Sequence, residues 1–140
     1  MTARTALTPV GLVQDGAVSE GAGTAIAGLV AGGAYVADPP GPFRVFLLVN
    51  NSGASAANVT VRAGGSGTTA SGGTNPGVPF TDATVGDLVT PVAAAGTEMI
   101  GPFTTDRFCQ ADGSVSVDFA GGMTGTIWVF AYPNPGVGGE

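Results

Sequence analysis

The stretch that decides the fold runs from residue 97 to residue 132, TEMIGPFTTDRFCQADGSVSVDFAGGMTGTIWVFAY. Between residues 114 and 119, valine and phenylalanine alternate with serine and aspartate, the period-two pattern of a strand with one buried face. Residues 126–132 (TIWVFAY) are apolar at almost every position. The stretch therefore predicts a half-buried strand followed by a strand with neither face in water.

The half-buried strand is preceded by an Asp-Gly pair at 112–113, which favours a type I′ hairpin turn. With these two residues as the loop, Phe108 faces Val117 and Arg107 faces Asp118. The sequence thus predicts a hairpin with its own cross-strand ion pair.

A second hairpin is predicted from residues 43–50 (FRVFLLVN) and 57–63 (ANVTVRA), which are rich in β-branched and aromatic residues. Its register places Arg44 directly across from Arg62, where the two like charges repel unless carboxylates of a neighbouring strand or of a partner face them. The same register buries one face of the hairpin, formed by Val45, Leu47 and Val49 against Val61, Val59 and Ala57.

The remaining segments are also short and extended. Residues 4–13, interrupted by Pro9, predict an extended arm or an edge strand, because proline cannot donate to a central ladder. Two short strands are expected near residues 24–27 and 34–37, and a further pair at 88–92 and 98–100, joined by a turn at 93–96.

These strands predict an all-β protein, a single antiparallel β-sandwich of the jelly-roll or immunoglobulin type, without significant helix. We expect three parts: an arm or edge strand at 1–20, the sandwich at 21–132 and a tail at 133–140. Within the sandwich, residues 64–79 (GGSGTTASGGTNPGVP) lack periodicity and predict a mobile loop.

Composition narrows the possible functions. The 140 residues carry a net charge of −6 and include no lysine and no histidine, which argues against binding of nucleic acid and against a histidine-based catalytic triad. Cys109 is the single cysteine, so a disulfide framework within one chain is excluded. The aspartates lack the spacing of a calcium loop. We expect no catalytic residues, no metal, no cofactor and no enzymatic activity.

Membrane insertion and export are not expected either. Residues 21–37 are uncharged, but 17 residues with five glycines make a poor transmembrane helix. The first residues also lack the charged region and apolar run of a signal peptide.

Two groups of residues are candidates for an interface. The first is the aromatic row Trp128, Phe130 and Tyr132, which is left over if Ile127, Val129 and Ala131 fill the core. A partner, or the N-terminal segment of the chain itself, could cover this row, and both interpretations stay open. The second group combines the arginine pair with the arm, which could add to a neighbour's sheet edge: Arg44, Arg62, Leu7, Pro9 and Val10.

Three segments carry a resemblance to a known family: FLLVNNSGASAANVTV at 46–61, VAAAGTEMIGPF at 92–103 and RFCQADGSVSVDF at 107–119. In this order, followed by a hydrophobic last strand, they resemble the small β-sandwich head decoration proteins of tailed bacteriophages. The most specific piece is IGPF, followed closely by the ADG turn and the alternating VSVDF strand.

The resemblance implies a virion protein on the capsid exterior, assembled in the cytoplasm of the host bacterium. Its partner would be the major capsid protein, whose neighbouring subunits it would cement, often as a homotrimer, without nucleic acid or membrane. A carbohydrate-binding tail, fibre or adhesion domain, with Trp128, Tyr132 or Tyr35 as the stacking platform, is the alternative.

Overall fold

The computed structural model describes residues 4–12, 16–36, 45–63, 87–101, 108 and 114–131. These residues form ten strands in two sheets, with one short 3₁₀ helix, η1 (Ile26–Gly28), and the predicted β-sandwich is confirmed. The loop predicted at 64–79, the tail at 133–140, Arg44, Arg107, Cys109, Tyr132 and the Asp-Gly turn at 112–113 lie outside the described residues.

Sheet 1 has the strand order β1-β4-β9-β6-β7. Its strands pair antiparallel, except that β1 runs parallel to β4. The bounds in sheet order are β1 (Thr5–Leu7), β4 (Ala34–Val36), β9 (Val115–Phe119), β6 (Ala57–Val61) and β7 (Leu88–Val92).

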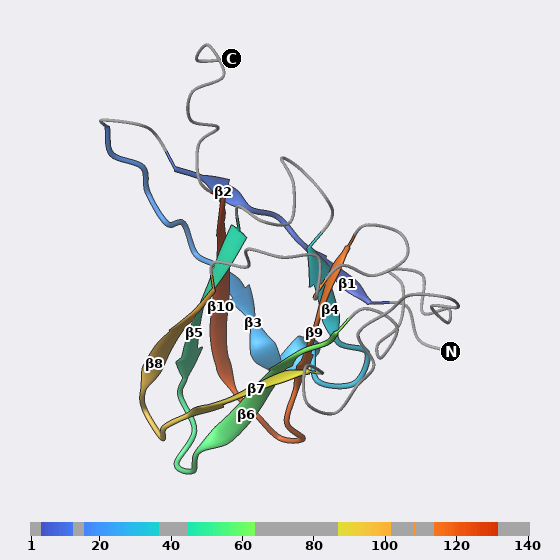
Figure 1. The fold of residues 1–140 in the computed structure, drawn as a ribbon. Helices are drawn as coiled ribbons and strands as arrows, with labels where there is room; N and C mark the ends of the chain where they lie inside the picture. Colours follow the sequence, from blue (N-terminus) through green and yellow to red (C-terminus); the bar gives the residue numbers. More distant parts are fainter. Residues whose placement is uncertain are drawn as a thin grey trace, which may run out of the picture.

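Sheet 2 has the order β2-β10-β5-β8, and β3 pairs with β10 beside β2. The β2–β10 pair is parallel and the others are antiparallel, so both sheets are mixed rather than purely antiparallel. The bounds are β2 (Val10–Gly11), β10 (Gly125–Ala131), β5 (Val45–Asn51), β8 (Thr97–Ile100) and β3 (Thr24–Ala25). Figure 1 shows β8, β5 and β10 in one layer and β4 and β9 in the other.

The core lies between the two sheets and consists mainly of β-branched residues. The fully buried side chains include Leu47 and Val49 of β5, Ile127 of β10, and Val59 and Val61 of β6. Because side chains alternate along a strand, the neighbours of these residues point to the outer faces of the sandwich.

The predicted hairpin register at Val117 is wrong. Val117 pairs with Ala34 of β4 on one side and with Val61 of β6 on the other, so β9 is a central strand with both edges occupied. Phe108 therefore cannot lie opposite Val117, and it is instead buried in the core. The turn signal indicated a reversal of the chain, but it did not indicate which strands would flank β9.

The second predicted hairpin is also wrong, although the predicted strands exist. β5 pairs with β10 and β8 in sheet 2, whereas β6 pairs with β9 and β7 in sheet 1. The two strands therefore belong to different sheets, and the predicted register between them does not form. Five of the six side chains expected to be buried on this hairpin are buried, and Ala57 is partly buried. The alternation of buried residues along a strand is the same whether the next strand pairs with it in one sheet or belongs to the opposite sheet. The sequence pattern therefore did not distinguish the two arrangements.

Asn51 holds the chain where it passes from sheet 2 to sheet 1. Its amide nitrogen donates to the carbonyl oxygens of Ser55 (2.9 Å), Val92 (3.0 Å) and Ala93 (3.3 Å). Its amide oxygen accepts a hydrogen bond from the backbone N–H of Gly53 at 2.9 Å. Asn51 is 1% exposed, so one buried side chain ties the β5–β6 connection to the β7–β8 connection, which makes the same passage between sheets.

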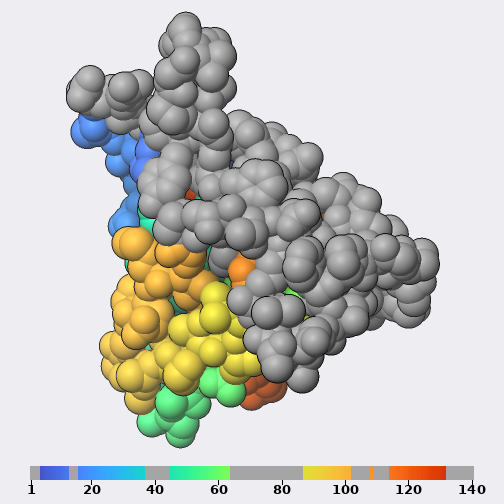
Figure 2. Space-filling model, in the orientation of Figure 1, coloured from blue at the N-terminus to red at the C-terminus, as the bar shows by residue number. Residues whose placement is uncertain are grey.

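The N-terminal segment closes the opposite side of the sandwich. β1 is an edge strand of sheet 1 and β2 borders β10 in sheet 2, so residues 5–11 cross from one sheet to the other. Pro9 lies between the two strands, where the ladder does not need its missing N–H. At the other edges of the two sheets, the chain passes from sheet 1 to sheet 2 through β7 and β8. These two strands lie side by side on the surface in Figure 2.

Candidate functional site

The outer faces of the two sheets differ in chemistry. Most of the side chains of sheet 1 that alternate with its core residues are polar, namely Tyr35, Asn58, Thr60, Ser116 and Asp118. The apolar ones are Ala6, Val89 and Pro91. On sheet 2, two of the three cross-strand rows of outer side chains are apolar, and we call them the apolar stripe: Val10, Phe46, Leu48, Met99, Trp128 and Phe130. The third row, formed by Thr126, Asn50 and Thr97, is polar. Sheet 2 therefore has apolar side chains on much of its outer face as well as on its core face, which a two-layer sandwich does not require.

The apolar stripe has two cross-strand rows. In one row, Phe46 and Phe130 are directly paired and their rings stack, with centroids 5.3 Å apart and an interplanar angle of 26°. In the other row, Leu48 lies between Trp128 and Met99. Phe46 and Phe130 are buried, Leu48 and Trp128 are half-buried, and Met99 is 62% exposed. The stripe thus becomes more accessible toward β8.

The chain itself covers part of Trp128. The indole Nε1 donates to the carbonyl oxygen of Gly21 at 3.1 Å. Gly23 comes so close that a Cβ atom there would lie 2.8 Å from the same Nε1. Gly23 also has a φ of +71°, so this approach requires glycine. Segment 21–24 therefore provides some of the cover that the sequence left open between the chain and a partner.

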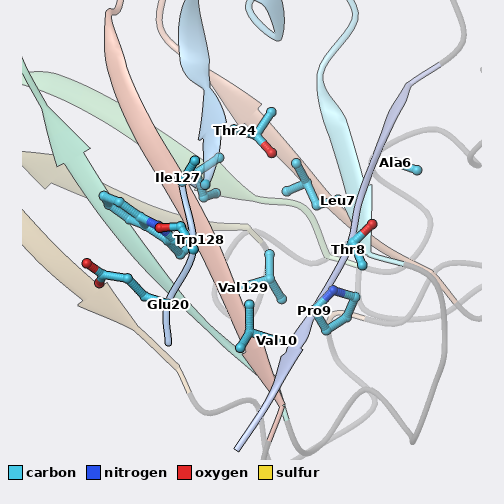
Figure 3. Close-up of a pocket in the computed structure, with 13 residues that line it drawn as sticks. Ala6, Leu7, Thr8, Pro9, Val10, Glu20, Thr24, Ile127, Trp128 and Val129 are labelled. Atoms are coloured by element: carbon cyan, nitrogen blue, oxygen red, sulfur yellow. The ribbon is translucent and has the colours of Figure 1, made fainter. Parts of the chain in front are cut away.

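A cavity lies beside Trp128, at the edge of β10. On this edge β3 pairs with Thr126 and Ile127, and β2 pairs with Phe130 and Ala131, which leaves Trp128 and Val129 between the two short strands. We call this cavity the β10 notch. It has a volume of about 310 Å³. Figure 3 shows Thr8, Pro9 and Val10 along one side, and Glu20 and the Trp128 ring along the other.

A charged network on sheet 1 contains two of the residues discussed above, Arg62 and Asp118, together with Arg4 and Asp87. Arg4 donates to Asp118, Nη1 to Oδ1 at 2.7 Å, and also to the carbonyl oxygen of Val117 at 3.2 Å. Arg62 lies 3.5 Å from Asp118 and 3.3 Å from Asp87. The side chain of Arg4 is 4% exposed and those of the other three are 24–36% exposed. Two positive and two negative groups alternate, so the network balances its own charge.

In this network, Asp118 has partners other than the predicted one, and Arg62 contacts two carboxylates. The sequence assigned Asp118 to Arg107, which lies outside the described residues, whereas the structure pairs Asp118 with Arg4 and Arg62. Arg62 faces carboxylates of β9 and of the residue before β7, one of the two arrangements anticipated for it. Sequence reasoning missed Arg4 because no local pattern connects residues 114 positions apart.

The other candidate interface residues have separate locations. Leu7 is 4% exposed and belongs to the core, so its side chain is not on the surface. Pro9 and Val10 are half-buried and line the notch. The structure thus brings Pro9, Val10 and Trp128 together and places Arg62 on the other sheet. Leu48 and Met99 were not singled out from the sequence, although the run FLLV at 46–49 could have indicated a strand apolar on both faces.

No cluster of three or more His, Cys, Asp or Glu side chains that could hold a metal ion occurs among the described residues. Within the same ranges, no helix has the length and apolarity needed to cross a membrane. Comparison of the chain with protein-family models, curated proteins and solved structures finds no match.

Proposed function

We propose that this protein is a virion structural protein that binds the outer surface of an icosahedral phage capsid and cements neighbouring major capsid subunits. The observation that supports this most directly is the apolar stripe, with Met99 62% exposed at its accessible end. Exposed apolar surface on one face of a sandwich is typical of an interaction surface. The resemblance of residues 43–132 to head decoration proteins supplies the nature of the partner.

Two further properties are consistent with this proposal. The outer side chains of sheet 1 are mostly polar and those of sheet 2 are mostly apolar, so the two outer sides of one molecule differ in chemistry. On a repeating lattice, weak individual contacts can also give strong overall binding, because several contacts made at once raise the apparent affinity. The homotrimeric state belongs to the same proposal, since it rests on the resemblance alone.

The alternative function, carbohydrate binding through exposed aromatic side chains, has less support. Of the rings named as stacking platforms, Tyr132 lies outside the described residues, and Tyr35 is half-buried on sheet 1. Trp128 is half-buried, and its N–H group already donates to Gly21. A sugar platform usually needs a more accessible ring.

The test is to mix the purified protein with undecorated phage capsids and to image them by electron cryomicroscopy. We expect regular additional density at lattice axes, with the apolar stripe toward the shell. Met99→Glu should weaken binding by at least about fivefold, because it places a charge at the contact. The matched control is Val89→Glu, since Val89 is 52% exposed but lies on sheet 1. Absence of binding at micromolar concentration, or equal loss in both variants, would contradict the proposal.

A further inference from the structure

Strand β8 is an open edge of sheet 2. It pairs with β5 on one side, and no strand of the described residues pairs with its other side. Thr97, Glu98 and Met99 are exposed, and Figure 2 shows β8 on the surface. An open edge presents backbone N–H and C=O groups to which a further strand can bind. β8 can therefore accept a strand from outside the chain.

The other edge strands are less suited to such pairing. In β7, Pro91 has no N–H to donate. β1, β2 and β3 consist of only two or three residues each, and short edge strands offer few groups for pairing. β8 has four residues and no proline. It is therefore the longest proline-free edge strand in the part of the chain that the structure describes.

The pairing between β5 and β8 shows which backbone groups of β8 point outward. The N–H of Asn51 donates to the carbonyl oxygen of Gly96 at 2.8 Å, so Gly96 faces β5. Successive residues of an antiparallel strand direct their backbone groups to opposite sides, so Glu98 also faces β5. Thr97 and Met99 therefore direct their N–H and C=O groups away from β5, toward the open side.

We propose that β8 pairs antiparallel with β8 of a second copy of this chain, about a two-fold axis that passes at Met99. Such a contact uses the same surface of both molecules. It continues sheet 2 across the two molecules and brings the row of Trp128, Leu48 and Met99 end to end with the same row of the second copy. The two apolar stripes then form one continuous surface.

The charge of Glu98 excludes one register of this pairing. In an antiparallel pair, outward-facing residues lie opposite outward-facing residues, so the axis has to pass at a residue of β8 rather than between two residues. With Glu98 at the axis, the two Glu98 side chains would be directly opposite and would repel each other. With Met99 at the axis, Glu98 instead lies opposite Ile100 of the second copy.

The ends of β8 exclude the two remaining registers. With Thr97 at the axis, Met99 would lie opposite Ala95, and with Ile100 at the axis it would lie opposite Gly101. Ala95 and Gly101 lie outside β8 and have φ angles of +54° and +111°, so neither continues the strand. Only the register with Met99 at the axis pairs Met99 within the strand. The strand is therefore self-complementary, which selects a second copy as the occupant.

This inference deepens the proposed function, on which its role on a shell rests. A trimer about a three-fold axis has to use other surfaces, so on a shell the β8 contact would join molecules of adjacent trimers. Because β8 ends at Ile100, the contact is short and its affinity in solution is low. A lattice that holds the molecules close together would strengthen it.

The experiment places a cysteine at the axis, as Met99→Cys in the full chain with Cys109→Ala. The Cα atoms of a hydrogen-bonded antiparallel pair are about 5.5 Å apart, which is within disulfide range. With copper phenanthroline as the oxidant, the covalent dimer should form at least about tenfold faster than with Val89→Cys, because pairing raises the local thiol concentration. Val89 is 52% exposed on β7, so this variant controls for random collision.

Thr97→Cys in the same background tests the register. The two Thr97 residues would be displaced by four residues along the strands, or about 13 Å, which is beyond disulfide range. This variant should therefore form dimers as slowly as Val89→Cys. Equal rates for Met99→Cys and Val89→Cys, or the fastest rate for Thr97→Cys, would overturn the proposal.

Sedimentation tests the same contact without a cysteine. The mass of the parent should rise with concentration up to about 1 mM, and Met99→Lys should reduce this rise because it places like charges at the axis. A parent of constant mass, or an unchanged rise in Met99→Lys, would contradict the pairing. Capsid binding without disulfide formation at residue 99 would refute the pairing alone. Conversely, disulfide formation without capsid binding would refute only the decoration role.

Discussion

Arg4 and Asp118 are 114 residues apart in the sequence, and their side chains meet at 2.7 Å. Gly33 lies directly beneath this contact, because a Cβ atom there would collide with Arg4 Nη1 and Asp118 Oδ1. The contact attaches the N-terminal segment to the central strand of sheet 1. Substitution of either residue therefore tests how much the attachment of residues 5–11 contributes to the stability of the sandwich.

Arg4→Ala should lower the free energy of unfolding by about 1–3 kcal/mol, because it removes several hydrogen bonds of a buried guanidinium. Denaturant unfolding followed by circular dichroism measures the change. Combining it with Asp118→Asn in a double-mutant cycle should reveal coupling, since both substitutions act on one ion pair. Strict additivity of the two effects would contradict the pairing.

Asn51→Ala should destabilise the protein by about 2–3 kcal/mol, because it leaves buried carbonyl oxygens of two connections without their donor. The control is Asn58→Ala, since Asn58 is an exposed asparagine on β6. Its effect should stay within about 0.5 kcal/mol. Thermal unfolding of both variants would decide the matter, and similar melting temperatures would argue against a role of Asn51 between the sheets.

Gly23→Ala and Gly21→Ala separate backbone strain from contact with Trp128. Both glycines have φ near +70°, but an added Cβ has open space at Gly21 and meets Trp128 and Thr126 at Gly23. Each substitution should cost about 1 kcal/mol for the backbone, and Gly23→Ala should cost more. Only Gly23→Ala should shift the tryptophan emission maximum strongly toward the red. A comparable shift in both variants would contradict this reading of the close approach.

Ala95→Gly is expected to stabilise the protein. Ala95 has a φ of +54°, the one positive value among described residues other than glycine, and it lies in the turn between β7 and β8. Relief of this strain should gain about 0.5–1 kcal/mol, partly offset by the greater freedom of glycine in the unfolded chain. Ala94→Gly has no strain to relieve and should be neutral or destabilising. The pair can be compared by chemical denaturation.

The sequence indicates the parts of the fold that depend on neighbouring residues better than those that depend on contacts between residues far apart in the chain. The sequence predicted a strand at 88–92, and alternation predicted one within 114–119; β7 (Leu88–Val92) and β9 (Val115–Phe119) lie at these positions. Partners were predicted less well, because a strand such as β5 buries the same residues whether β6 lies beside it or across the core. Among the site residues, Trp128 was singled out from its apolar run and Val10 as part of the predicted arm, whereas Glu20 and Met99 carry no local signal.

The sequence by itself determined that the chain folds into short strands around an aliphatic core, since side-chain alternation and turn residues act over a few positions. Tertiary structure alone decided that β5 and β6 belong to different sheets, that Arg4 reaches Asp118, and that β2 and β3 leave a notch beside Trp128. The physical reason is that pairing and ion contacts join residues distant in the sequence. Which of them meet depends on how both sheets close at once.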